Sequence, residues 1–374
     1  MPAKPLSIWH PFTQEALDPQ PIHIERGQGV YLYTRDARKL IDAISSWWVN
    51  LHGHAHPLIA EAIAEQARKL EHVIFAGFTH DAAEELAQRL RRVLPQPLEH
   101  IFFSDDGSTA VEVALKMALQ FWRNQGKQRK NKFVGLEHAY HGDTVGAMSV
   151  GAEFDFVAAF QGLRFPVWRV PSAHCFRCPV GKRRATCDID CVGPLCLSKG
   201  LTGGFLPLAA TVCTPAVYET FRSTDRSHTF FHGHSYTANP LGCAAAVANL
   251  KIFDSEPVFE RIAVIEKIHS QRAPALAAHP AVADVRTIGT VMALELKADD
   301  PGYFSELRPA LYDFYLDKGV LLRPLGNVVY ILPPYVITPE QLHYVYEVIA
   351  ESLDRVPWLA AQRAGHGTAR QETE

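Results

Sequence analysis

One lysine and its neighbours carry the strongest chemical signal in this sequence. Lys199 follows a short apolar run at 194–197, which predicts the end of a buried strand, and Gly200 comes directly after it. Desolvation at the mouth of such a strand disfavours the charged form of an amine. A neutral amine can form a Schiff base with an aldehyde cofactor. A solvent-reaching lysine at an ordinary strand end is the simpler interpretation of the same residues.

A second signal lies at Gly107 and Ser108, where a predicted strand at 101–103 meets a predicted helix. The first N–H groups of a helix have no partner within the helix, and with the helix dipole they bind phosphate. Thr109 and Glu112 fit a capping box at this helix start. The segment therefore predicts either a phosphate site or an ordinary helix cap.

Three further segments place aromatic or charged side chains beside predicted strands and helices. Tyr140, in the polar segment 137–144, is suited to stacking on a cofactor ring or to half-burial in a polar turn. The polar and aromatic loop 229–240 precedes a helix, and such loops usually serve a site or an interface. Arg323 ends a predicted strand, where it can hold a carboxylate with two hydrogen bonds or lie on the surface.

The composition limits the class of protein. The chain has 374 residues, 47% of them hydrophobic, which is enough for a large α/β domain and a smaller one. Its net charge of −3 gives no electrostatic footprint for nucleic acid. No apolar run approaches the roughly 18 residues of a membrane span, and no signal peptide is evident. Seven cysteines, an odd number, suit a reducing compartment, so we expect a cytoplasmic protein.

The order of predicted elements indicates an α/β fold. Strands separated by helices predict a parallel, doubly wound sheet, with strands at 101–103, 132–136, 167–170, 194–197 and 208–212. Downstream of residue 253 the pattern changes to an α+β layer, with strands at 291–296, 320–323 and 328–332. We expect a large domain over 51–253, a smaller domain over 254–360 and a disordered tail over 361–374.

Taken in order, these motifs resemble those of the class III aminotransferases, fold-type-I enzymes that use pyridoxal phosphate (PLP). The resemblance covers nearly all of residues 8–355. It rests on the segments 8–14, 45–54, 104–112, 138–144, 198–204, 232–242 and 322–335. The Trp-His-Pro opening at 9–11 and the tandem Trp47 and Trp48 are similar to the branch of the family that serves biotin synthesis. The resemblance also implies that residues 1–50 pack with the smaller domain.

The resemblance implies PLP as the cofactor. Lys199 is then the Schiff-base lysine and proton shuttle, and Tyr140 stacks on the pyridine ring. Phosphate contacts come from two places: the start of the helix, and a loop that reaches across from the partner subunit of a homodimer. The residues concerned are Gly107 and Ser108 at the helix, and Gly233, His234 and Ser235 in the loop.

The resemblance also implies the substrate contacts. Trp47 and Trp48 line the substrate channel with Tyr330 nearby, and Arg323 anchors a carboxylate. Phe12 stands where many relatives have a substrate-contacting tyrosine, so that hydroxyl is missing here. Lys199, Tyr140 and Gly233 also face the substrate.

The implied reaction moves an amino group from S-adenosylmethionine through PLP to 8-amino-7-oxononanoate, giving 7,8-diaminononanoate. Lysine is the alternative donor. Another class III ω-amino transaminase, or a degenerate relative of low activity, is the alternative function. Small molecules are the expected substrates, with no nucleic acid or membrane partner.

The resemblance is interrupted between Gly193 and Pro194. Relatives carry about two further strand–helix units there, of roughly 30 residues each. One of them supplies the aspartate that pairs with the pyridine nitrogen and keeps the ring protonated as an electron sink. Asp188 and Asp190 lie among cysteines and are no substitute. The missing strands should be central in the sheet, so their loss should leave a large gap in the core.

Four cysteines lie just before this interruption, at positions 175, 178, 187 and 191. Cys175, Cys178, Cys187 and Cys191 have a spacing that suits tetrahedral zinc in a structural site. A reduced loop without metal is the alternative, and metal analysis of the purified protein distinguishes the two. We expect no metal in the catalytic site.

Overall fold

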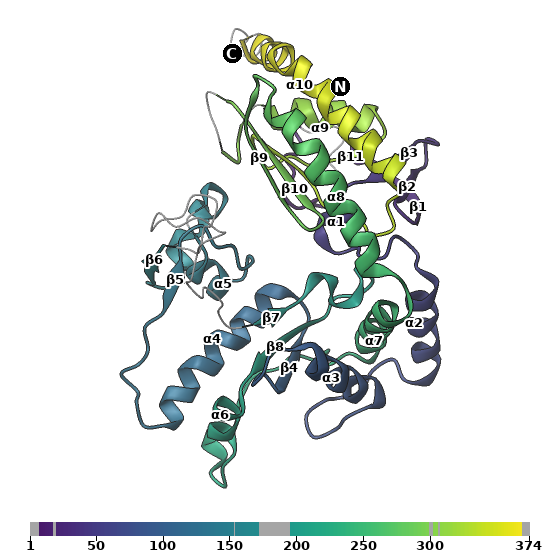
Figure 1. Cartoon of the computed structure of the whole chain (residues 1–374). Helices are drawn as coiled ribbons and strands as arrows, with labels where there is room; N and C mark the ends of the chain where they lie inside the picture. Colours follow the sequence, from purple (N-terminus) through teal and green to yellow (C-terminus); the bar gives the residue numbers. More distant parts are fainter. Residues whose placement is uncertain are drawn as a thin grey trace.

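The computed structural model describes residues 7–17, 20–152, 154–171, 195–298, 302–305 and 307–368. The four-cysteine segment, Asp188, Asp190 and the join between Gly193 and Pro194 lie outside these residues. Figure 1 shows the small C-terminal domain above and the elements of the large domain below. No helix in the described part of the chain combines the length and hydropathy that a membrane span needs.

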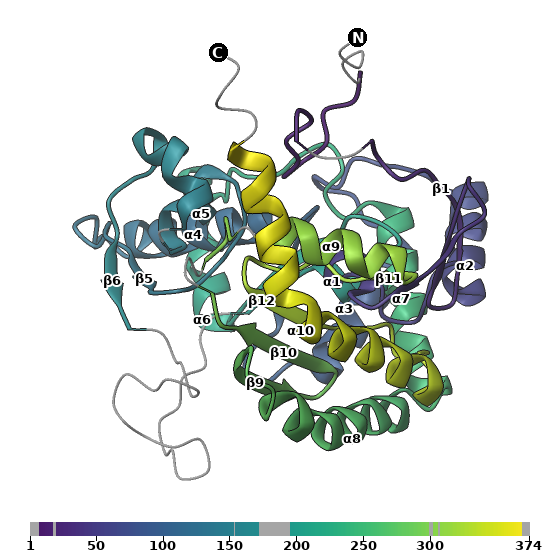
Figure 2. The same ribbon diagram turned by 90° about the horizontal axis from the view of Figure 1, so that it is seen from above.

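The C-terminal elements share one hydrophobic core. An antiparallel sheet has the order β12–β10–β9, and α10 crosses it beside α9 and α8 (Figure 2). The bounds are α8 (Val258–Ala277), β9 (Val282–Ile288), β10 (Val291–Leu296), α9 (Leu307–Asp317), β12 (Val328–Ile331) and α10 (Pro339–Thr368). One face of α10 is apolar and packs on this core, because Leu342, Val345, Ile349 and Leu353 are all buried.

The N-terminal segment joins this core. A second sheet has the order β1–β2–β3–β11, and β3 runs parallel to β11. Val30, Ile41 and Ile44 pack in the same apolar cluster as the C-terminal helices. The bounds are β1 (Ile24–Gln28), β2 (Tyr31–Thr34), β3 (Lys39–Asp42) and β11 (Val320–Leu321). The domain limits themselves stay predictions.

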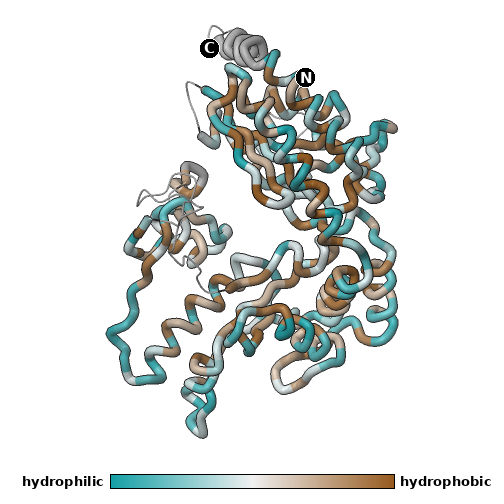
Figure 3. The backbone as a smooth tube through the Cα atoms, viewed as in Figure 1, coloured by the Kyte–Doolittle hydropathy of each residue, from teal (hydrophilic) through white to brown (hydrophobic). Residues whose placement is uncertain are grey.

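The large domain is built around α7 (Pro240–Ser255), a helix buried on nearly all sides because small apolar residues fill 243–248 (Figure 3). Beside it lies a three-stranded sheet of order β4–β8–β7, paired antiparallel throughout. The short link between β7 and β8 allows antiparallel pairing but not a parallel crossover. The remaining bounds are α2 (Pro57–Lys69), α3 (Asp81–Val93), β4 (His100–Ser104), β7 (Cys196–Leu197), η3 (Lys199–Thr202), β8 (Ala209–Cys213), α6 (Pro215–Tyr218), η4 (Glu219–Phe221) and η5 (Arg226–His228).

A separate parallel sheet of two strands, β5 (Val134–Leu136) and β6 (Trp168–Val170), stands apart from β4–β8–β7 (Figure 1). On one of its faces the Arg169 guanidinium donates to carbonyls of α5 (Val145–Val150). On the other face every side chain is exposed: Val134, Leu136, Trp168 and Val170. α4 (Gly107–Asn124) runs between the two sheets, and η1 (Asp155–Leu163) completes this part. The expected single parallel sheet is therefore found in two pieces, divided where the sequence predicts missing strands.

Other expectations were corrected in detail. The capping box at the start of α4 is centred on Asp106, which exchanges hydrogen bonds with Thr109; Glu112 instead accepts from the N–H groups of Gly146 and Ala147. α10 continues to Thr368, so residues 361–368 are helical rather than a disordered tail. The N-terminal strands, α2, α3 and β9 were not predicted, although Ala82, Ala83, Leu86 and Leu90 give α3 a regular buried face.

Candidate functional site

A cavity of about 730 Å³ lies between the start of α4 and the turn that follows β7. Gly107, Ser108, Tyr140 and Lys199 all line it, so residues from three separate sequence motifs meet at one place. A Cβ atom built on Gly107 would lie 3.4 Å from Cβ of Ser198, which shows how closely the two segments approach. This volume is in the range of small-molecule and cofactor sites.

Lys199 begins η3 and has a φ of 48°, in the left-handed region that costs energy for any residue with a Cβ atom. Its side chain is exposed in the cavity rather than desolvated at a strand mouth, so the expected burial is wrong. The reason is that β7 is only half-buried in the described sheet. The Lys199 Nζ atom lies 5.4 Å from the centre of the Trp48 ring, within cation–π range.

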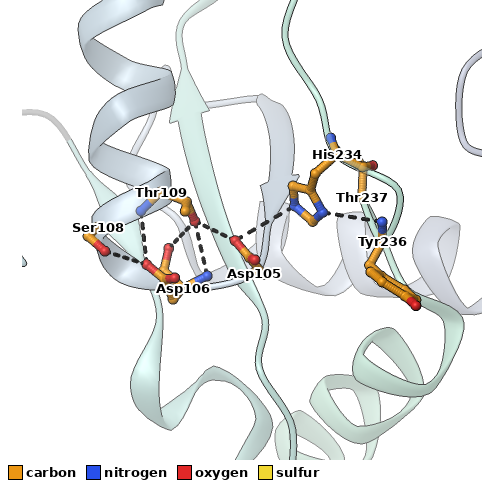
Figure 4. Close-up of polar contacts among 7 residues, drawn as sticks. All are labelled: Asp105, Asp106, Ser108, Thr109, His234, Tyr236 and Thr237. Carbon is orange, nitrogen blue, oxygen red and sulfur yellow. Dashed lines mark hydrogen bonds and ion pairs between the residues drawn. The ribbon is translucent and has the colours of Figure 1, made fainter. Parts of the chain in front are cut away.

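The start of α4 is built to face an anion. Asp106 caps the helix by accepting from the Thr109 N–H at 2.9 Å, and the Ser108 hydroxyl donates to Asp106 at 2.6 Å (Figure 4). The Thr109 hydroxyl donates to Asp105 at 2.7 Å. These bonds fix the helix start and leave the first turn pointing at the cavity, which fits a phosphate group.

Tyr140 and His141 reach the cavity from the connection between β5 and α5. The Tyr140 hydroxyl donates to Asp143 at 3.0 Å. Partial burial, together with the nearby Asp143 charge, raises the pKa of Tyr140, so it stays a neutral ring. Burial and the neighbouring Arg169 lower the pKa of His141, which leaves its imidazole neutral near pH 7.

The loop 232–237 does not line this cavity, although it lies close by. The His234 Nε2 atom is 3.7 Å from Asp105, and the His234 N–H donates to the Thr237 hydroxyl at 3.1 Å (Figure 4). Gly233 and Ser235 are likewise absent from the lining of this chain's own cavity. Their predicted role in a partner's site stays a prediction.

The expected substrate residues gather in a second cluster beside the lysine. The Trp48 ring packs edge-on against Tyr330, with ring centres 5.9 Å apart. Phe12 packs edge-on against Trp47 at 5.4 Å, and the Arg323 guanidinium lies 4.5 Å from the Trp47 ring. The buried Tyr330 hydroxyl and Trp48 indole N–H have no hydrogen-bond partner in the described part of the chain.

A left-handed turn presents both tryptophans. α1 (Ser45–Trp48) has φ values of 49°, 44°, 71° and 73° along its four residues. Left-handed helical residues with side chains cost about 1–2 kcal/mol each. Such a turn persists only where several contacts with surrounding residues hold it in this conformation.

Asp42, which was not predicted from the sequence, holds this turn in its left-handed conformation. Its carboxylate is fully buried and accepts from the Ile44 and Ser46 N–H groups at 3.2 and 3.0 Å. It also accepts from the Ser46 hydroxyl at 2.7 Å and from His54 Nε2 at 2.9 Å. A single aspartate between a strand and a Ser-Ser pair is the only sequence signal for this role, and it is common in turns.

Comparison with known proteins agrees with this geometry. The family model described as Aminotransferase class-III matches residues 12–188 and 187–353. The chain is 41% identical to the adenosylmethionine-8-amino-7-oxononanoate aminotransferase of Synechococcus elongatus, over 95% of this chain and 100% of that protein. The crystal structure of the enzyme of the same name from Methanocaldococcus jannaschii has a TM-score of 0.86 at 32% identity, over 93% of this chain and 97% of that one.

A lysine and the start of a helix line one cofactor-sized cavity, in a fold shared with class III aminotransferases. The chain belongs to the class III aminotransferase family. Among structures that share only the fold, a PLP-bound amine transaminase from an uncultivated Pseudomonas species has a TM-score of 0.85 at 24% identity, over 94% of this chain and 99% of that one.

The comparisons also confirm the interrupted resemblance. The alignment with the Synechococcus protein spans 429 positions, so even if all 374 residues were matched, 55 positions would have no counterpart here. The family model matches in two segments that meet at 187–188, a few residues before the predicted join. The shortfall corresponds to about two strand–helix units of roughly 30 residues each.

Replacing Asp42 tests how the left-handed turn Ser45–Trp48 is held in place. We expect Asp42→Asn to lower the free energy of unfolding by about 3 kcal/mol, because the buried charge is lost and an N–H donor replaces the oxygen that accepts from the Ser46 hydroxyl and His54. Near-UV circular dichroism should also weaken as Trp47 and Trp48 lose their fixed setting. Asp36→Asn, at an exposed aspartate, is the control and should leave both the urea midpoint and the spectrum unchanged. A wild-type spectrum and midpoint in Asp42→Asn would contradict this account.

Proposed function

We propose that this chain is a PLP-dependent transaminase of biotin biosynthesis that moves an amino group from S-adenosylmethionine to 8-amino-7-oxononanoate, giving 7,8-diaminononanoate. The observation that carries the proposal is the Lys199 amine, which faces a cavity closed on its other side by the start of α4. Relatives between 28% and 41% identical, from eight organisms, bear the name of this enzyme. That agreement favours it over another ω-amino transaminase.

The residues of the cavity fit PLP at three of its groups. The N–H groups of Gly107 and Ser108 at the capped start of α4 suit its phosphate, and Tyr140 suits its ring. The Lys199 amine suits its aldehyde. When bound, PLP withdraws electrons from the carbon that carries the amino group, so that a proton can leave that carbon.

The chain's own residues then hold and move a proton. Lys199 is the base that accepts the proton at Nζ and returns it, because it is the lysine that lines the cavity. His141, neutral at physiological pH, adds no positive charge beside it. Trp48 fixes the position of the amine from the substrate side.

The second cluster recognises the substrate. Trp47 and Trp48 offer flat apolar walls for a long carbon chain, and Phe12 extends them without a hydroxyl. The buried Tyr330 hydroxyl and Trp48 N–H are polar groups that a substrate can satisfy. Arg323 is then the anchor for a carboxylate, with its planar guanidinium held against Trp47.

The proposal includes a cytoplasmic homodimer with shared active sites. Gly233, His234 and Ser235 lie on a loop that approaches the start of α4 through Asp105 but does not line the cavity of its own chain. Such a loop is free to complete the phosphate site of a second subunit. The free cysteines of the described part, Cys196, Cys213 and Cys243, agree with a reducing compartment.

One feature favours a second candidate, a relative of low activity. Three carboxylates line the cavity, and each is already bonded: Asp105 to Thr109, Asp106 to Ser108 and Asp143 to Tyr140. The aspartate expected at the pyridine nitrogen belongs to the missing segment. Without it the developing negative charge has no protonated ring to receive it.

Replacing Lys199 tests the central role. We expect Lys199→Ala to abolish transamination while PLP still binds through its phosphate. Borohydride reduction of the wild-type protein, followed by peptide mapping, should place the pyridoxyl group on Lys199. Lys251→Ala, at an exposed lysine on α7, is the control and should keep activity. A pyridoxyl group on any other lysine would contradict the assignment of Lys199 as the Schiff-base lysine.

Replacing Arg323 tests the carboxylate anchor. We expect Arg323→Ala to slow mainly the half-reaction whose substrate brings a carboxylate to this position, by about 10–100-fold, since a charge-assisted contact is worth about 1.5–3 kcal/mol. Single-turnover kinetics with each substrate separates the two half-reactions. Arg308→Ala, which removes another arginine of the small domain, is the control. Equal small effects on both half-reactions would assign Arg323 a surface role.

Restoring the missing segment tests the second candidate. We expect the aligned segment of the Synechococcus relative, inserted between Gly193 and Pro194, to raise kcat much more than it changes KM. The reason is that the restored carboxylate acts as charge develops. A glycine- and serine-rich insert of equal length is the control and should not rescue activity. Full activity of the chain as it stands would show that another residue supplies the carboxylate.

A further inference from the structure

A buried hydrogen-bond chain outside the cavity supports the turn that carries Lys199. Asn249, on α7, is 2% exposed. Its Nδ2 atom donates to the Gly200 carbonyl at 3.2 Å and to the Leu201 carbonyl at 3.1 Å. These are the two residues directly after the lysine, so the Asn249 amide binds the carbonyl groups of both.

His52 holds the amide in turn. The His52 Nε2 atom lies 2.9 Å from Asn249 Oδ1, and both side chains are buried. Because Nδ2 donates to two carbonyls, Oδ1 must accept, and His52 therefore carries its hydrogen on Nε2. Burial lowers the pKa of His52 to about 4, so the ring stays neutral. The buried His52 Nδ1 atom has no partner in the described part of the chain, as this tautomer allows.

The backbone of the turn needs such support. Lys199 has a φ of 48°, which a residue with a Cβ atom adopts only where its surroundings impose it. The turn has little room to adjust, since a Cβ atom on Gly203 would lie 2.8 Å from Ile59 and 3.1 Å from Asn249 Oδ1. A Cβ atom on Gly200 would lie 2.9 Å from Leu51. Close packing limits the turn from one side, and hydrogen bonds hold it from the other.

We propose that Asn249 is a positioning residue for Lys199. Its two hydrogen bonds keep Lys199 in the left-handed conformation from which the amine faces the cavity, and His52 fixes the orientation of the amide. The inference rests on the proposed role of Lys199 and goes beyond it, because Asn249 does not line the cavity. It acts through the backbone of the turn rather than on a substrate.

The test compares Asn249→Ala with a variant that removes an equally buried hydrogen bond far from the lysine. Ser352→Ala serves, because the Ser352 hydroxyl lies 2.9 Å from the buried Tyr315 hydroxyl between α10 and α9. The first readout is the pH midpoint of the absorbance of lysine-bound PLP. The second is the rate at which acetic anhydride labels Lys199 in the cofactor-free protein, relative to the exposed Lys127.

We expect Asn249→Ala to move the absorbance midpoint by roughly one pH unit, a tenfold change in the proton equilibrium. It should also change the relative labelling of Lys199 several-fold. Ser352→Ala should lower the unfolding temperature and move neither readout. If Asn249→Ala merely unfolds earlier, with both readouts as in wild type, Asn249 is only a packing residue and the proposal is overturned.

Two His52 variants keep the proposal testable if Asn249→Ala does not fold. Glutamine can place an N–H near the position of Nε2, so His52→Gln should behave as wild type, whereas His52→Leu should shift both readouts in the direction expected for Asn249→Ala. Equal behaviour of the two variants contradicts the proposal. Wild-type protein that forms no lysine-bound PLP would contradict the proposed function instead, while the labelling of the cofactor-free protein still decides the role of Asn249.

Discussion

The site depends on the close packing of one segment, residues 42–54, against the lysine turn. A Cβ atom on Gly204 would lie 2.7 Å from the Val49 carbonyl oxygen, so the two backbones touch with no side chain between them. The same segment carries Trp48 at one end of the contact and His52 at the other. The lysine and the aromatic walls are therefore held by a common support, and neither can shift without the other.

The interrupted sheet has a different consequence for each half of the large domain. β4, β7 and β8 keep their core, because α7 and α3 cover them with buried apolar residues. β5 and β6 keep only one covered face, and Trp168 and Val134 lie exposed on the other. Exposed apolar sheet faces of this kind favour association with other chains. This division is what the sequence analysis predicts if the missing strands are central in the sheet.

Much of this site could be predicted from the sequence, and the limits have physical causes. The local signals at Lys199 and Gly107, a strand end and a helix start, each left a simpler alternative open, and the resemblance to the family assigned both residues to the site. Asp42 and Asn249 are not, because each acts through bonds to residues that meet only in the fold. The strand β7 was predicted as buried and is half-buried, since burial depends on neighbours that a local pattern does not record.

α4 compensates in part for the missing strands. The Glu112 side chain accepts from the Gly146 and Ala147 N–H groups at 2.6 and 3.2 Å, which ties the start of α5 directly to α4. Gly142 lies against Ser108 with no room for a Cβ atom, so the segment carrying Tyr140 is also fixed to the helix start. Tyr140 thus keeps its place relative to the start of α4 through contacts with the helix rather than through the sheet. The parts of the cavity lined by Gly107, Ser108 and Tyr140 are therefore fixed to one another through α4, independently of how the sheet is divided.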